Sequence, residues 1–138
     1  MRQDLVLVDT SAWICFFARR GFPEIKGAVT RFLDENRVAI AGPVVIELIQ
    51  GCRDETEKGE IEECLRGLHY LSIMDEHWHQ AARLAFDLRR KGVTVSAIDV
   101  LIATTAITYH CLLLHHDQDY DLMVRYYPVL KTYNPHQT

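Results

Sequence analysis

The chain of 138 residues has the length of one ordinary domain, and its 49% hydrophobic and 25% charged residues exclude a disordered, collagenous or coiled-coil protein. Its formal net charge of −4, from 19 acids and 15 bases, argues against nucleic-acid binding through bulk positive charge. Asp4 and Asp9 interrupt the N-terminal apolar stretch, and no apolar run approaches the roughly 18 residues that span a bilayer. We therefore expect a cytoplasmic protein without membrane association and a single domain over residues 1–138.

The first half of the chain alternates apolar runs with helical patterns. Leu5–Val8 is a continuous run of strand formers, which predicts a strand buried on both faces. Asp9, Thr10 and Ser11 are helix-capping residues and predict a helix over Ala12–Arg19. The further elements expected here are a helix over Pro23–Asn36, a strand over Val38–Ala41, a helix over Val44–Gln50 and a helix over about Glu57–Arg66.

The second half continues the alternation. Its expected elements are a strand over His69–Met74, helices over Asp75–Lys91 and Ser96–Tyr109, a strand over Cys111–Leu114, a helix over Tyr120–Tyr126 and an edge strand over Val129–Tyr133. Short apolar strands that alternate with helices predict an α/β fold. We expect a mostly parallel sheet of four to five strands covered by helices on both sides.

Cysteine and histidine residues give no sign of a zinc site. The four cysteines form no CxxC pair, so we expect buried, reduced thiols. His77 and His79 lie two residues apart on a predicted helix and point to different faces. We expect these two histidines at the surface or partly packed.

Four carboxylates stand alone in otherwise uncharged segments. Asp9 is the only charged residue from position 5 to 18, Glu47 from 38 to 50, and Asp99 from 93 to 116, while Asp117 is the first charge after a predicted strand. Buried acids are rare unless they are paired or bind a cation. Asp9 and Asp117 follow the carboxyl ends of predicted parallel strands, where open α/β sheets place their ligand crevice. We expect the four acids to converge there.

Convergent carboxylates repel one another unless they are protonated or neutralised by a cation. Oxygen ligands favour Mg²⁺ or Mn²⁺, and such a site supports hydrolysis of a phosphodiester bond. Helix capping is the alternative explanation for Asp9, for Asp99 within Ser96-Ala-Ile-Asp99, and for the polar turn at Asp117. Glu47 has no such alternative, because it lies inside a predicted helix among apolar residues.

Four motifs in this order resemble the PIN-domain ribonucleases, most closely the VapC-type toxins of bacterial toxin–antitoxin pairs. They are Val8-Asp9-Thr10-Ser11-Ala12, Glu47 in Pro-Val-Val-Ile-Glu-Leu-Ile-Gln-Gly, Asp99 in Ser-Ala-Ile-Asp-Val-Leu-Ile-Ala, and His-Asp117-Gln-Asp119-Tyr120-Asp. The resemblance covers essentially the whole chain. It implies a three-layer α/β/α sandwich and an endoribonuclease that depends on Mg²⁺ or Mn²⁺.

The resemblance also implies roles for individual residues. Asp9 and Asp99 would be the principal metal ligands, with Glu47 and Asp117 completing the site directly or through water. Ser11 and Asp119 match supporting positions, a small hydroxyl near the first acid and a second acid after the fourth. His115 departs from the family pattern, because many members carry Thr or Ser there. A contact of His115 or His116 with the substrate stays open.

The partners implied are an RNA substrate, a cognate antitoxin and a second copy of the toxin. We expect an amphipathic antitoxin segment between the helices over Val44–Gln50 and Glu57–Arg66, with an Arg that bridges the carboxylates. Two alternatives stay open, a housekeeping PIN nuclease of RNA maturation and a receiver-like module that binds Mg²⁺. A receiver would have paired acids after its first strand and a late lysine near the site, whereas Asp4 lies too early and Lys131 is the only late lysine.

Overall fold

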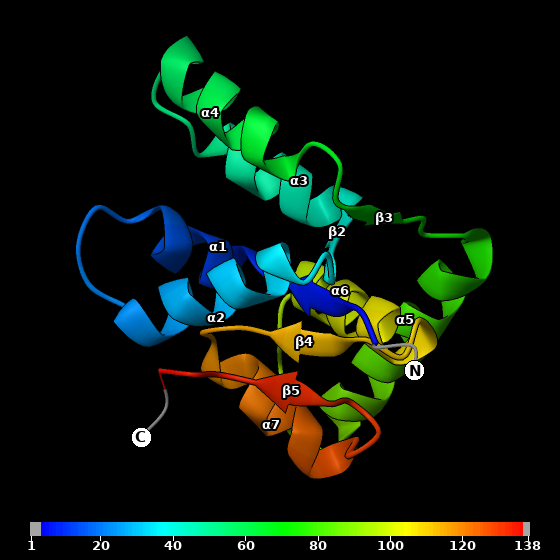
Figure 1. Cartoon of the computed structure of the whole chain (residues 1–138). Coiled ribbons are helices and arrows are strands. Elements are labelled where there is room, and N and C mark those ends of the chain that lie inside the picture. Colours follow the sequence, from blue (N-terminus) through cyan, green and yellow to red (C-terminus); the bar gives the residue numbers. More distant parts are fainter. Residues whose placement is uncertain (1–3, 137–138) are drawn as a thin grey trace.

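The computed structural model describes residues 4–136, and within this range it forms one sheet of five strands (Figure 1). The strands are β1 (Val6–Val8), β2 (Val38–Ala41), β3 (His69–Leu71), β4 (Leu112–Leu114) and β5 (Thr132–Tyr133). They lie in the order β3-β2-β1-β4-β5, and every neighbouring pair is parallel. The expected α/β fold with a parallel sheet of four to five strands is confirmed.

Helices pack in two groups that flank this sheet, which gives the expected α/β/α sandwich. The helices are α1 (Thr10–Phe17), α2 (Pro23–Asp34), α3 (Gly42–Gln50), α4 (Glu55–Leu65), α5 (Asp75–Arg90), α6 (Ala97–Thr108) and α7 (Gln118–Tyr126). Helix α1 packs against α2 and α3, and α3 packs against α4, whereas α6 packs against α5 and α7. Figure 1 shows the first group toward the upper left of the sheet and the second group behind it and below.

The order in which strands are added to the sheet changes sides at β1 and β4, although all strands are parallel. From β1 the chain moves outward through β2 to β3, and later it returns on the other side of β1 as β4 and then β5. Val8 is level with Leu114 in the parallel pair, so both strands end at the same edge. Such a switch point is where open α/β sheets leave a crevice for ligands. The receiver order is 2-1-3-4-5, so the receiver-like alternative is wrong for this chain.

The core is centred on the sheet and on two of its helices. All residues of β1 and β2 are buried, as a central parallel strand covered on both faces requires. In α6 the run Val100–Ala106 is buried throughout, and the Trp13 side chain of α1 stacks on Phe17 with ring centroids 5.6 Å apart. Helices α1 and α6 begin at the carboxyl edge of the sheet, and their buried side chains hold them in place there.

Two edge strands are shorter than their apolar patterns predict. Strand β3 ends at Leu71 rather than at Met74, and β5 covers only Thr132–Tyr133 rather than 129–133. Short edge strands leave few unpaired backbone groups for another chain to pair with. Helices α1, α3, α4 and α7 each begin two residues earlier than expected. In three of them an aspartate side chain caps the first turn: Asp9 before α1, Asp54 before α4 and Asp117 before α7.

His77 corrects one sequence-based expectation. It is not at the surface or partly packed but buried, with 3% of its surface exposed, and its Nδ1 accepts the backbone N–H of Met74 at 2.8 Å. The imidazole therefore caps the first turn of α5 instead of meeting solvent, while His79 is exposed as expected.

The cysteines, all within the described part of the chain, form no disulfide. Cys15 and Cys111 are buried as expected, whereas Cys52 and Cys64 are only half-buried. No helix within residues 4–136 has both the length and the apolar character needed to cross a membrane.

Candidate metal centre

Asp9 joins the end of β1 to the start of α1 and is held by hydrogen bonds on both carboxylate oxygens. Its Oδ2 accepts the backbone N–H of Ser11 at 3.0 Å and the Ser11 hydroxyl at 2.7 Å. Its Oδ1 accepts the hydroxyl of Tyr120 at 2.7 Å. The side chain is 3% exposed, and hydrogen bonds of this kind are what a buried carboxylate needs. Helix capping and a place in the site are therefore compatible roles for Asp9.

Ser11 also links the first strand to the fourth. Its Oγ accepts the backbone N–H of His116 at 2.9 Å, just beyond the end of β4. Ser11 thus supplies a hydroxyl contact at this strand end, where the family resemblance predicts Ser or Thr and this chain has His115. One serine holds both chain segments that carry the acids at the switch point.

Asp117 caps α7 and lies beside a second acid. Its Oδ1 accepts the backbone N–H of Asp119 at 2.9 Å, and its own backbone N–H donates to Nδ1 of His115 at 3.1 Å. These bonds fix the turn between β4 and α7. They leave the other carboxylate oxygen of Asp117 free to face the neighbouring helix.

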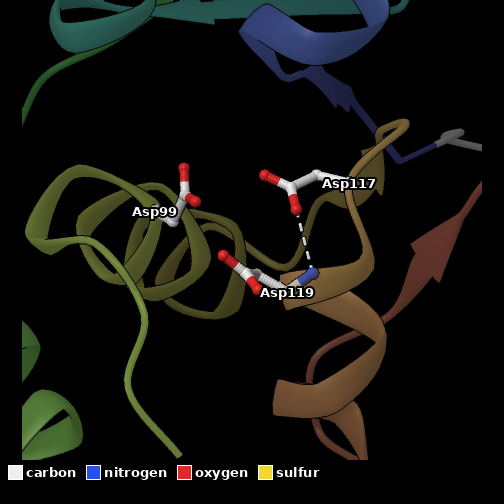
Figure 2. Close-up of side chains that lie close together, drawn as sticks. All are labelled: Asp99, Asp117 and Asp119. Carbon is white, nitrogen blue, oxygen red and sulfur yellow. Dashed lines mark hydrogen bonds between the residues drawn. The ribbon is translucent and has the colours of Figure 1, made fainter.

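Asp99 meets these acids from the first turn of α6. Its backbone N–H donates to Oγ of Ser96, the N-cap of that helix, at 3.1 Å. One carboxylate oxygen from each of Asp99, Asp117 and Asp119 lies within 4.8 Å of the other two. Figure 2 shows the three carboxylates facing one another, Asp99 from α6 and the other two from the start of α7. The structure therefore brings together Asp99, Asp117 and Asp119.

Glu47 lies on α3 and contacts the residue that follows Asp9. It is exposed on α3, and its Oε1 accepts the hydroxyl of Thr10 at 2.7 Å. Thr10 directly follows Asp9, so the contact brings the middle of α3 to the start of α1. The place of Glu47 in the metal centre stays a prediction.

Negative charges and burial together change the protonation of the site. Burial raises the pKa of Asp99 to about 6, and the charges of Asp9 and Asp117 add to the rise, while hydrogen bonds with Ser96 and Tyr120 partly offset it. Partial burial and the charge of Asp117 also raise the pKa of Asp119. Repulsion of this kind is relieved when a cation binds.

The metal-free protein should lose stability as the pH rises from about 4 to about 6. In this window the folded protein holds a proton on Asp99 that the unfolded chain, with a pKa near 3.8, has already released. The free energy of unfolding therefore falls as the pH rises through this window. The total fall is on the order of 1–2 kcal/mol once solvent screening is taken into account. Chemical denaturation in EDTA at several pH values measures this. The Asp99→Asn variant should gain on the wild type as the pH rises, and a constant difference between them would contradict the assignment.

Tyr120 and His115 lie against the candidate site, although the sequence pattern assigned no role to Tyr120 and left only a substrate contact open for His115. Tyr120 is fully buried, and its hydroxyl lies 2.7 Å from Asp9 Oδ1 and 3.3 Å from Asp99 Oδ1. His115 is fully buried beside the Tyr120 ring, with centroids 5.1 Å apart. Burial lowers the pKa of His115, which favours the neutral ring. Because Nδ1 accepts the backbone N–H of Asp117, the neutral ring carries its proton on Nε2. A buried His115 does not reach a substrate.

The residues present fit a hard divalent cation. Mg²⁺ and Mn²⁺ favour carboxylate oxygens and water, and three acids here each offer a carboxylate oxygen within 4.8 Å of the others. Within residues 4–136, no Lys or Arg forms an ion pair with Asp99, Asp117 or Asp119. Their negative charge is therefore left for an external cation to neutralise.

Known proteins resemble this chain both in sequence and in fold. The PIN domain family model matches residues 6–125. Ribonuclease VapC11 of Mycobacterium tuberculosis is 34% identical over an alignment of 126 residues that covers 88% of this chain and 92% of that protein. VapBC2 from Rickettsia felis, solved with a DNA fragment from its promoter, has 18% identity and a TM-score of 0.77, covering 94% of this chain and 98% of that one. A toxin–antitoxin complex from Klebsiella pneumoniae has 19% identity and a TM-score of 0.70, covering 96% and 99%.

These findings confirm the resemblance carried by the four acidic motifs. The two solved structures are each less than 25% identical to this chain in sequence, so they establish only that the fold is shared. The family model and Ribonuclease VapC11 establish the family. The chain belongs to the PIN-domain family and, within it, to the VapC ribonucleases.

Proposed function

We propose that this protein is an endoribonuclease toxin that depends on Mg²⁺ or Mn²⁺ and is neutralised by a cognate antitoxin. The observation that carries the proposal is the convergence of Asp99, Asp117 and Asp119 beside Asp9, at the switch point of a PIN fold. The curated relative named a ribonuclease supports RNA as the substrate, and its VapC name favours a toxin over a housekeeping nuclease. We place its action in the cytoplasm, where RNA is abundant.

In this proposal the acids have different roles in binding the cation. Asp9 and Asp99 would be the principal ligands, Glu47 and Asp117 would complete the site directly or through water, and Ser11 and Asp119 would support them. When bound, a divalent cation would lower the pKa of a coordinated water and offset charge on the phosphoryl oxygens of RNA. Ser11 keeps Asp9 oriented toward the site, and His115 keeps the turn of Asp117 in place.

The test is a cleavage assay with the purified chain and a mixed-sequence RNA. We expect cleavage in Mn²⁺ or Mg²⁺, no cleavage in EDTA, and recovery when the metal is added back. Attack by water on phosphorus with departure of the 3′-oxygen would leave 5′-phosphate and 3′-hydroxyl ends, which ligation and phosphatase treatment identify. Undiminished cleavage in EDTA, or 2′,3′-cyclic phosphate ends, would indicate a metal-independent ribonuclease.

A hollow of about 660 Å³ supports the antitoxin proposal, although not where the sequence suggested. It opens between the end of α1 and the first half of α4, not between α3 and α4. Phe17 and Ile61 are its large apolar lining residues. Its charged lining is mixed: Arg19 and Arg53 lie among the acids Asp54, Glu57 and Glu60, and Arg53 pairs with Glu57 at 3.1 Å, which leaves Glu60 as an acid for a basic partner residue. Such a surface suits an amphipathic segment with apolar anchors and basic residues. The Klebsiella pneumoniae neighbour was solved as a toxin–antitoxin complex, which is consistent with a protein partner for this chain.

We also propose a homodimer. Met74, Trp78 and Phe86 are each more than half exposed and recur at a spacing of four or eight residues, which places them along one face at α5. Large exposed apolar side chains in a row are typical of protein interfaces. A molar mass in solution equal to one chain of 15.9 kDa would contradict the dimer.

A further inference from the structure

We infer that the Tyr120 hydroxyl is a positioning group that holds two of the proposed metal ligands, Asp9 and Asp99, at their working separation. The inference rests on the proposed metal centre and adds to it a residue that neither the motif nor the comparisons assign. Tyr120 does not contact the reacting atoms in this view, because it is fully buried beneath the acids. It acts through the carboxylates.

The hydrogen bonds of the two acids explain why the hydroxyl matters. Both acceptor positions of Asp9 Oδ2 are taken by Ser11, so Oδ1 is the oxygen left for an external ligand. The Tyr120 hydroxyl, 2.7 Å from Oδ1, occupies one of its two lone pairs and leaves the other. The same hydroxyl lies 3.3 Å from Asp99 Oδ1. One phenol oxygen therefore ties the end of β1 to the first turn of α6.

Tyr120 is itself held rigidly. It lies in the first turn of α7, three residues after Asp117, so a single helical turn presents both the acid and the phenol. The buried His115 ring packs against the phenol ring, and its Nδ1 accepts the Asp117 backbone N–H. Movement of Tyr120 would disturb both contacts. The phenol thus links α7 to Asp9 and Asp99 with little freedom to adjust.

Removal of this hydroxyl should weaken metal binding. Without it, Ser96 is the remaining hydrogen-bond partner near Asp99, and Asp9 Oδ1 loses its donor. The two negative side chains are then free to separate, and a cation must draw them back together. Loss of a partner that orients metal ligands typically reduces metal affinity by about 10–100-fold.

The experiment compares Tyr120→Phe with the wild type in the full chain, with Mn²⁺ alone as the probe. Tyr109→Phe is the matched control, because the Tyr109 hydroxyl also donates a hydrogen bond, to the Ser72 carbonyl at 2.6 Å. Electron paramagnetic resonance counts free Mn²⁺ during titration. We expect a dissociation constant at least about 10-fold higher for Tyr120→Phe and an unchanged one for Tyr109→Phe. In the RNA assay, the Mn²⁺ concentration for half activity should rise in parallel, with kcat at saturating Mn²⁺ within about 3-fold.

A measurement on the wild type covers the case in which Tyr120→Phe fails to fold. With ¹³C-labelled tyrosine, saturating Mg²⁺ should shift the resonance of the hydroxyl-bearing carbon of Tyr120 and leave that of Tyr109 in place. Equal Mn²⁺ affinity of Tyr120→Phe and wild type, or an unshifted Tyr120 resonance, overturns the inference while the metal centre stands. A wild type that binds no Mn²⁺ overturns the proposed function instead.

Discussion

Asp99→Asn is expected to reduce RNA cleavage by at least about 100-fold while the protein stays folded. The substitution keeps the shape of the side chain but removes one negative ligand from a site whose charge attracts the cation. Asp99 is the acid whose charge is opposed most strongly by its surroundings, since burial and the neighbouring carboxylates raise its pKa to about 6. The neutral amide relieves this repulsion, so the metal-free variant should be at least as stable as the wild type.

Asp34→Asn is the matched control for this variant. Asp34 is exposed at the end of α2, just before β2, and therefore at the amino edge of the sheet rather than the carboxyl edge. Its charge is also lost, so any general effect of net charge on RNA binding appears in both variants. Cleavage rates at saturating Mn²⁺ and circular dichroism spectra are measured side by side. Full activity of metal-saturated Asp99→Asn would remove Asp99 from the proposed site.

Co-expression with the product of the neighbouring reading frame should relieve growth arrest caused by this protein. Four acids near one edge of the sheet attract an Arg of the partner, whose guanidinium bridges two carboxylates and takes the place of the cation. The purified complex should then bind Mn²⁺ at least about 10-fold more weakly than the free chain. A stable complex with unchanged Mn²⁺ affinity would show that the partner blocks only the RNA.

Two substitutions on α4 test where the partner binds. Glu60 lines the hollow between α1 and α4, whereas Glu63 is exposed on the same helix and does not. Glu60→Lys should weaken the complex, because it places a positive charge against a basic partner segment. Glu63→Lys changes the net charge equally and should leave the affinity unchanged. Equal affinities for both variants would place the partner elsewhere.

The sequence predicted the strands and the edge at which the site lies, because these depend on local patterns. Apolar runs at Leu5–Val8 and Cys111–Leu114 indicate buried parallel strands, and parallel strands that are neighbours end at the same edge. Asp9 and Asp117 come shortly after the ends of these two strands, so their place at this edge could be predicted. The supporting position of Asp119 was also in the motif, and the structure places it among the converging acids.

The contacts that complete the site depend on distant partners and left no local signal. Tyr120 has the pattern of a residue on the apolar side of a short helix, and its hydroxyl finds Asp9 at a separation of 111 residues. The bond between Thr10 and Glu47 is likewise set by how α1 meets α3. His77 was misplaced for a different reason, since its imidazole caps its own helix and is covered by tertiary packing. The spacing of apolar residues along the sequence indicates neither contacts between distant residues nor a side chain that caps its own helix.

The central place of β1 in the sheet has a consequence for synthesis of the protein. The ribosome makes Asp9 before the rest of this fold, and β4 and α7, which meet it, come more than a hundred residues later. Contacts this distant along the chain form late in folding, after most of the polypeptide has been released. A nascent chain that ends before α7 has no Asp117, Asp119 or Tyr120 with which to complete the site. Harmful activity therefore has to wait until α7 has been synthesised, which gives a partner made beforehand the opportunity to meet the enzyme as it becomes competent.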